Sequence, residues 1–210
     1  MRSLLLSIFF LCSATLFSQT VGLFENDSLA FDGYTLFSPS TSNKAYLVDN
    51  CGELINSWTT NYFPGLDAVV LPDGRFARAA RWAGDFNGGG VGGRIEIYSW
   101  EGDLEWGYIY ASEEVHQHHD FEVLPNGNVL ILAWEDRSEQ QAIDAGRNPA
   151  SIGLNGVWPD HIVEVEPVGI NQGNIVWEWH AWDHLVQDYD PSKDNYGVVA
   201  DHPELIDVNY

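Results

Sequence analysis

The sequence has 210 residues, of which 31 are acidic and 9 are Lys or Arg, and its formal net charge is −22. This charge argues against binding nucleic acid or an anionic membrane through bulk electrostatics, and an anionic substrate must be held by a local cluster of donors. The two cysteines are Cys12 and Cys51. Because Cys12 lies in a predicted signal peptide, Cys51 has no partner for an intrachain disulfide, and a buried core must stabilise the chain.

The chain begins with the pattern of an export signal. Arg2 precedes an almost wholly apolar run over residues 4–11, and small or polar residues follow over 13–20. The run is shorter than the roughly 20 apolar residues that a membrane-spanning helix needs. The sequence therefore predicts a signal peptide over residues 1–19 and a secreted or periplasmic protein without a membrane span.

The rest of the chain contains repeated segments. Residues 46–58, 95–106 and 161–179 each combine a strand, a turn containing glycine and a second strand with tryptophan, and residues 67–74 and 120–127 share the pattern Asp-x-x-Val-Leu-Pro-Asp/Asn-Gly. Equivalent residues lie about 50 positions apart, the length of a four-stranded propeller blade. The sequence predicts an all-β fold, a β-propeller of four-stranded antiparallel blades.

Trp58, Trp106 and Trp179 stand in the closing strands of these hairpins. A large aromatic side chain once per repeat most simply fills the space between neighbouring sheets. We expect the three to occupy equivalent positions in successive sheets. A β-sandwich is the alternative fold, although its strands would not be expected to repeat at this spacing.

Two irregular connections interrupt the repeats. Residues 84–93 are rich in glycine, and residues 136–160 form a longer loop. We expect one helical turn within residues 139–145 of that loop and another within residues 181–187.

All seven histidines fall after position 115, and the densest group is His116-Gln-His-His-Asp120. This group opens a predicted strand. Alternation along a strand puts His118 and Asp120 on one face and His119 on the other, so only one of the adjacent histidines is expected to point into a given cavity.

Three interpretations fit this group. A metal site needs imidazoles that converge with a carboxylate, and His116 with His118 supplies two of them. A catalytic site uses one histidine as nucleophile or proton donor, with Asp120 or a backbone carbonyl fixing its tautomer. A run of polar residues at a strand end is the third, and the spacing does not separate metal binding from catalysis.

A second group of aromatic and imidazole side chains covers residues 177–184. Trp177 and Trp179 share one strand face, and His180 lies on the other. Trp182 and His180 are candidate substrate-binding residues, and Trp177 and Trp179 are candidates for the same aryl-binding wall. Core packing is the simpler role for Trp177 and Trp179.

Taken together, these motifs resemble the bacterial arylsulfate sulfotransferases. The resemblance rests on His118-His119-Asp120 with the following Leu-Pro-Asn-Gly-Asn-Val-Leu, and on residues 173–179 and 201–206. It implies a six-bladed propeller outside the cytoplasm that moves a sulfuryl group from a phenolic sulfate ester to a phenol through a sulfated histidine. A nucleotide donor, other cofactor or metal is not implied, and the implied partners are small aryl sulfates and phenols rather than nucleic acid.

The resemblance carries over one active-site histidine alone, onto His118 or His119. Asp120 is the candidate orienting carboxylate because it follows them directly in the sequence. The family's later His-x-Asn pair, its arginine and its nucleophilic histidine cannot be placed in this sequence. Six blades take about 300 residues at this period. Residues 20–210 are therefore interpreted as an incomplete propeller, and we expect them to be inactive alone.

Two other functions remain open at this point. A secreted propeller that binds glycan or protein without catalysis needs no convergence of histidines. A metal-dependent or quinone-dependent propeller enzyme is the second alternative, because such proteins also carry tryptophan in their repeats.

Overall fold

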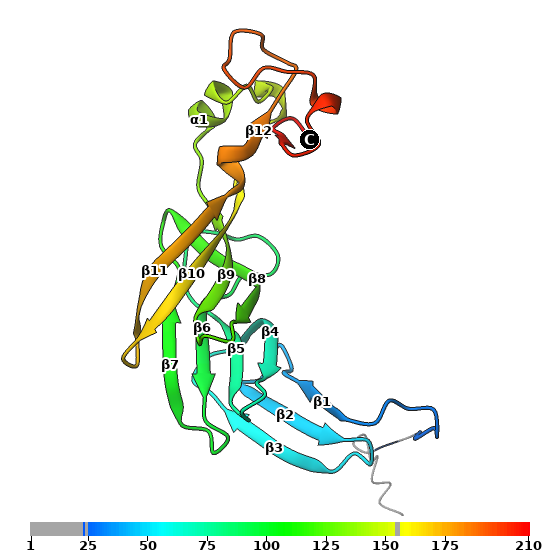
Figure 1. The fold of residues 1–210 in the computed structure, drawn as a ribbon. Coiled ribbons are helices and arrows are strands. Elements are labelled where there is room, and N and C mark those ends of the chain that lie inside the picture. The colour runs from blue at the N-terminus through cyan, green and yellow to red at the C-terminus, as the bar shows by residue number, and fades with distance from the viewer. Residues whose placement is uncertain (1–22, 24, 154–155) are drawn as a thin grey trace, which may run out of the picture.

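The computed structural model describes residues 23, 25–153 and 156–210. The predicted signal peptide, residues 1–19, lies outside this described part. Strands dominate the chain and form antiparallel sheets that follow one another in sequence order, as Figure 1 shows. The prediction of an all-β fold is confirmed.

Three sheets make up most of the structure. The first has the order β1-β2-β3, with β1 at Tyr34–Phe37, β2 at Lys44–Asp49 and β3 at Leu54–Thr59. The second has the order β4-β5-β6-β7, at Pro64–Val70, Phe76–Arg81, Gly93–Tyr98 and Leu104–Ile109. The third has the order β11-β10-β9-β8, with β8 at Val115–Val123, β9 at Val129–Glu135, β10 at Asp160–Val168 and β11 at Gln172–His180.

Short elements lie beyond one end of the third sheet in Figure 1. They are α1 at Glu139–Asp144, a parallel pair of β12 at Leu185–Val186 with β13 at Ile206–Asp207, and 3₁₀ turns at Pro149–Ser151, Ala181–His184 and Val199–Asp201. Both predicted helical turns are present. A capping box between Ser138 and Gln141 begins α1, because the two side chains satisfy backbone N–H groups that the helix leaves free.

The two Pro-Asp/Asn-Gly segments form the same turn, as their sequences predict. Gly74 and Gly127 have positive φ angles of 90° and 89°, which glycine adopts without steric cost. In each turn the glycine N–H donates to the carbonyl of the leucine three residues earlier, at 2.9 Å. The turns join β4 to β5 and β8 to β9, so the sequence repeat is also a structural repeat.

A register shift marks the last hairpin of each of the three sheets. Starting from the turn of each hairpin, the shift comes directly after one pair of residues. These pairs are Val48–Leu54, Tyr98–Leu104 and Val165–Ile175. Counted from this shift, Trp58 is equivalent to Trp179, whereas Trp106 is equivalent to Trp177. The expectation that Trp58, Trp106 and Trp179 share one position is therefore wrong for Trp106. Residues two apart on a strand share a face, so tryptophan fits between sheets at either position.

The second sheet is buried on both faces. One face packs against the first sheet in a cluster formed by Ala45, Leu47, Trp58, Phe76 and Tyr98. The other face packs against the third sheet, and this larger cluster includes Ala77, Ala79, Ile95, Ile97 and Trp106 with Phe121, Val129, Ile131, Val163 and Val165. The three sheets therefore stack face to face in sequence order.

Tryptophan side chains connect each sheet to the next through the same kind of hydrogen bond. Trp58 Nε1 donates to the Ser99 carbonyl at 3.0 Å, and Trp106 Nε1 donates to the Gln172 carbonyl at 2.9 Å. Each acceptor lies in the last hairpin of the following sheet. This arrangement is compatible with neighbouring propeller blades. Within the described residues, no helix has the length and apolar character needed to cross a membrane.

We predict that Trp106→Ala lowers the free energy of unfolding of the 210-residue chain by about 3–5 kcal/mol, because it opens a cavity between two sheets and leaves the Gln172 carbonyl without its donor. Trp177→Ala is the matched control, since Trp177 occupies the equivalent register position but is 49% exposed. Its cost is expected to stay below about 1 kcal/mol. Urea denaturation measures both, and equal losses would contradict the packing described here.

Candidate functional site

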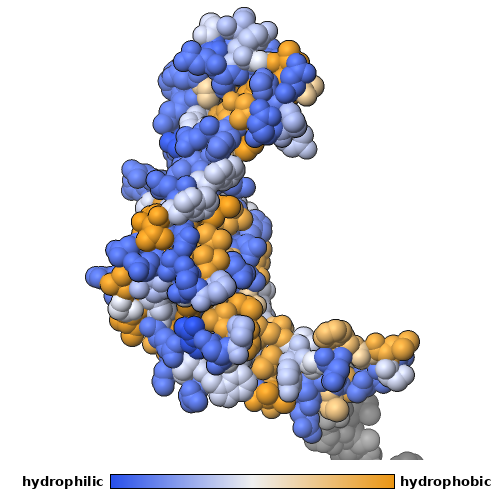
Figure 2. All heavy atoms as spheres, in the orientation of Figure 1, coloured by the Kyte–Doolittle hydropathy of each residue, from blue (hydrophilic) through white to orange (hydrophobic). Residues whose placement is uncertain are grey.

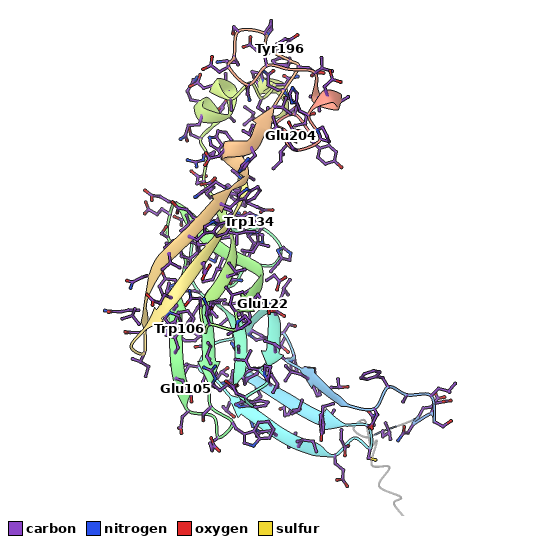
Figure 3. The ribbon with its side chains drawn as sticks, in the orientation of Figure 1. Glu105, Trp106, Glu122, Trp134, Tyr196 and Glu204 are labelled. Atoms are coloured by element: carbon purple, nitrogen blue, oxygen red, sulfur yellow. The ribbon has the colours of Figure 1, made fainter. Side chains whose placement is uncertain are left out.

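Histidines gather where β8, β9 and β10 come together at one end of the third sheet. His116 and His118 are buried on β8, and His119 is exposed beside them. Trp134, near the end of β9, stacks on the His118 ring at a centroid distance of 4.1 Å. Figure 3 shows Trp134 at this end of the sheet, toward the short C-terminal elements.

The rings of His118 and His119 lie on the same side of the strand, against the sequence-based expectation. Among the described residues that are not glycine, His119 alone has a positive φ, of 52°. The β8–β9 register shifts between Gln117 and Phe121, around this residue. Because the left-handed residue breaks the alternation of side chains, the two imidazoles meet with their Nδ1 atoms 2.8 Å apart.

Asp160 extends this contact into a row of three side chains, called here the histidine relay: Asp160, His118 and His119. Asp160 Oδ1 lies 3.1 Å from His118 Nε2. When His118 Nε2–H donates to the carboxylate, the bare Nδ1 of neutral His118 accepts from His119 Nδ1–H. This tautomer leaves a lone pair on Nε2 of His119, whose side chain is exposed. The relay can therefore move a proton between the surface and a buried imidazole.

Asp120 does not take the expected orienting position. Its Oδ1 accepts from the Phe121 N–H at 2.9 Å, and the carboxylate that faces His118 belongs to Asp160. The broken alternation at His119 turns Asp120 toward Asp67 instead. Burial, with the nearby negative charge of Asp120, raises the pKa of Asp67.

The glycine-rich segment, residues 84–93, packs directly on the histidines. Gly90 has a φ of 84°, and its backbone lies so close to the His119 ring that a Cβ at this position would overlap the ring. The Gly90 carbonyl also accepts from the His119 N–H at 2.9 Å. A Cβ on Gly84 would likewise overlap the His116 ring. Close backbone approach explains why glycine recurs in this segment.

A positively charged side chain, Arg81, lies near the relay. Arg81 lines a cavity of about 280 Å³ together with Leu66, Gly88, Gly90 and Val91. Gly90 is the residue that contacts His119, so the exposed Arg81 side chain borders the same part of the surface. Arginine donors bind oxyanions in a forked geometry.

His116 occupies a different environment from the relay. Both of its ring nitrogens are buried and have no hydrogen-bond partner among the described residues. Burial lowers the pKa of His116 below its usual value of 6.5. The sequence suggested a metal site that includes His116 and His118. In the described residues, the three side chains whose metal-ligating atoms converge are instead Glu135, His161 and His180.

The expected substrate-binding residues lie apart from the relay. His180 Nδ1 is 3.0 Å from Glu135 Oε2, and its ring stacks on His161. Trp182 lies under the Arg137 guanidinium, 5.3 Å from ring centroid to Cζ, and lines another cavity of about 360 Å³. Trp177 and Trp179 are on β11, the edge strand of the third sheet, and Trp179 stacks on His184.

Three side chains of the site were missed from the sequence: Trp134, Asp160 and Arg81. Asp160 directly precedes a predicted strand, and this position is the one sequence feature from which its role could have been inferred. Arg81 is the last residue of β5 and Trp134 the last but one of β9, and neither belongs to a recognisable motif. Their role depends on which strands become neighbours, and a single sequence does not show this.

A search of protein-family models and of characterised proteins finds no match to this chain. The resemblance to arylsulfate sulfotransferases therefore rests on the motif residues alone.

We predict that the chain loses stability as the pH falls from 7.5 to 5, in part because His116 is neutral in its buried site. The pKa of His116 is lower in the folded than in the unfolded state, so the unfolded state binds more protons below pH 6.5. His116 thus contributes stability above this pH that is lost on acidification.

Replacing His116 by Gln removes this contribution and should flatten the dependence of the melting temperature on pH. The slope is the readout, because the substitution also changes packing at every pH. His202→Gln, which removes a partly exposed imidazole, controls for the loss of a histidine as such. An unchanged slope in His116→Gln would show that His116 does not stay neutral in the fold.

Proposed function

We propose that this protein is an exported, propeller-type aryl-sulfate sulfotransferase that uses no nucleotide donor. The single observation that carries the proposal is the histidine relay, whose exposed end, His119 Nε2, is free to exchange a proton with a substrate. The signal-peptide pattern of residues 1–19 and the resemblance in residues 118–130 support the same proposal. The face-to-face stacking of the sheets supports a propeller.

In this proposal the relay supplies acid and base in turn. In the acid form, His118 carries protons on both nitrogens, and Asp160 compensates its positive charge. His119 is neutral and carries its proton on Nε2. His119 gives that proton to the phenolate oxygen as the ester S–O bond breaks and the sulfuryl group passes to an imidazole nucleophile. The His118 Nδ1 proton moves to His119 Nδ1 in the same step, so His119 stays neutral.

The second half of the reaction restores the relay. His119 Nε2 takes the proton of the acceptor phenol, whose oxygen attacks the sulfur as the N–S bond breaks. The proton on His119 Nδ1 returns to His118, so protons balance over one cycle. The resemblance assigns the sulfated nitrogen to a histidine other than His118 and His119. In the proposed reaction Arg81, which lines a cavity with Gly90, neutralises the sulfuryl oxygens against the acidic surface.

The test is transfer from 4-nitrophenyl sulfate to phenol by the protein as its gene encodes it. We expect His119→Ala and His118→Ala each to lower turnover about 10²–10⁴-fold, the range typical of a lost acid–base group. His202→Ala is the control for an imidazole outside the site. Full activity in the double variant His118→Ala, His119→Ala would contradict the proposal, and absence of any transfer by the native protein would favour a non-catalytic binding protein.

A glycine pair tests whether the position of His119 matters. Gly90→Ala and Gly102→Ala both place a side chain on left-handed backbone, with φ of 84° and 96°, but no atom surrounds the Gly102 Cβ position. The two variants should therefore lose similar stability from strain, whereas Gly90→Ala alone displaces the His119 ring and lowers turnover. Equal turnover in the two folded variants would show that His119 need not be held in place.

A further inference from the structure

A second cluster of ligating side chains lies at the same end of the third sheet. It consists of Glu135 at the end of β9, His161 at the start of β10 and His180 at the end of β11. His161 and His180 are register partners, and each of the three residues offers one nitrogen or oxygen within 4.8 Å of the other two. Trp134 and Asp160 are their strand neighbours and point to the opposite face.

Two atoms of this cluster are buried without a partner. Glu135 Oε1 and His161 Nδ1 have no hydrogen bond among the described residues, although the Glu135 side chain is 7% exposed and His161 is fully buried. A buried acceptor without a partner has lost its hydration with no hydrogen bond in return. Both lone pairs are therefore available to a ligand that accepts electron pairs.

Tyr110 prepares His161 as such a ligand. The Tyr110 hydroxyl lies 2.9 Å from His161 Nε2. When Nε2–H donates to this hydroxyl, the proton is fixed on Nε2 and the lone pair is on the unpartnered Nδ1. Metal-ligating histidines are held by the same kind of outer hydrogen bond on the second ring nitrogen.

The local charge also favours a cation. Glu178 Oε2 lies 3.6 Å from His180 Nε2, and Glu135 Oε2 lies 3.0 Å from His180 Nδ1. Arg137 is the single positive side chain paired with these carboxylates in the described chain, and its Nη2 contacts Glu135 Oε2 at 2.7 Å. This contact leaves Glu135 Oε1 free. The side chain of His180 is 24% exposed, which gives an ion a route from solvent.

We propose that Glu135, His161 and His180 bind one divalent transition-metal ion of the Zn²⁺ class, with a remaining coordination position for water. Two imidazoles and one carboxylate are a ligand set of zinc sites that keep an open position. Ligand atoms around tetrahedral Zn²⁺ lie about 3.4 Å apart, so each needs to move by about 1 Å, within the reach of side-chain torsions. On binding, His180 exchanges its contact with Glu135 for a bond to the ion.

The site is separate from the proposed sulfuryl transfer. Glu135 and His161 belong to the face of the third sheet that packs on the second sheet, and Tyr110 follows β7 of that second sheet. A bound ion would therefore join strands β9, β10 and β11 next to the contact between two sheets. We expect it to stabilise this contact, since binding to the folded state alone raises stability.

The experiment titrates the native protein, free of any histidine tag, with Zn²⁺ alone by calorimetry and with Co²⁺ by visible absorption. We expect one ion per chain, the absorption of a four-coordinate Co²⁺ with nitrogen and oxygen ligands, and a melting temperature that rises with Zn²⁺. Glu135→Gln and His180→Ala should weaken binding at least about 100-fold, and Tyr110→Phe about 10-fold or more.

His202→Ala is the matched control, because His202 and Glu204 form an imidazole–carboxylate pair 3.1 Å apart at another place. It should keep native affinity. Circular dichroism confirms that each variant is folded, and Glu135→Gln preserves shape if His180→Ala does not fold. Absence of saturable binding by the native protein, or unchanged affinity in folded Glu135→Gln, would overturn the proposal and leave Glu135–His180 as a structural ion pair.

Discussion

Burial of the second sheet on both faces is the constraint on which the rest of the structure depends. Strands β5 and β6 are buried along almost their whole length, so neither face of the sheet can meet water. The first and third sheets cover these faces, and Trp58 and Trp106 fix their spacing through hydrogen bonds to the next hairpin. The third sheet is covered least along its edge strand β11, where Ile175, Val176 and Trp177 are 45–52% exposed. Figure 2 shows apolar surface in this region.

Stacking of the sheets also assembles the candidate site. The glycine-rich segment joins β5 to β6, yet it lies on β8 of the next sheet because the two sheets are in contact. Because its glycines have no side chains, the backbone of this segment approaches His116 and His119 closely. The Gly90 carbonyl accepts a hydrogen bond from the His119 N–H. The left-handed conformation of His119 is held by this contact, and it brings the His119 ring onto His118, which in turn contacts Asp160. Conformational strain at one residue thus produces the relay.

The strands, the Pro-Asp/Asn-Gly turns and the approximate repeat could be predicted from the sequence because they depend on local alternation and turn chemistry. The arrangement at His118 and His119 could not, since alternation predicts opposite faces and a single positive φ reverses that result. Asp160 was missed for a related reason: it lies far from His118 in sequence, and β9 between them places the two together. The register of Trp106 depends on a strand irregularity that the repeat pattern does not show.

We propose that His119 exchanges the proton of the phenol, and a comparison of two leaving groups tests this exchange. Phenolate needs a proton as it leaves, whereas 4-nitrophenolate is stable without one. The measurement compares kcat/KM for phenyl sulfate with kcat/KM for 4-nitrophenyl sulfate, in the native protein and in His119→Ala, because kcat/KM for the donor reports the half-reaction in which the phenol leaves. We expect the loss caused by His119→Ala to be about 10-fold or more larger with phenyl sulfate than with 4-nitrophenyl sulfate. Equal losses for the two donors would contradict it.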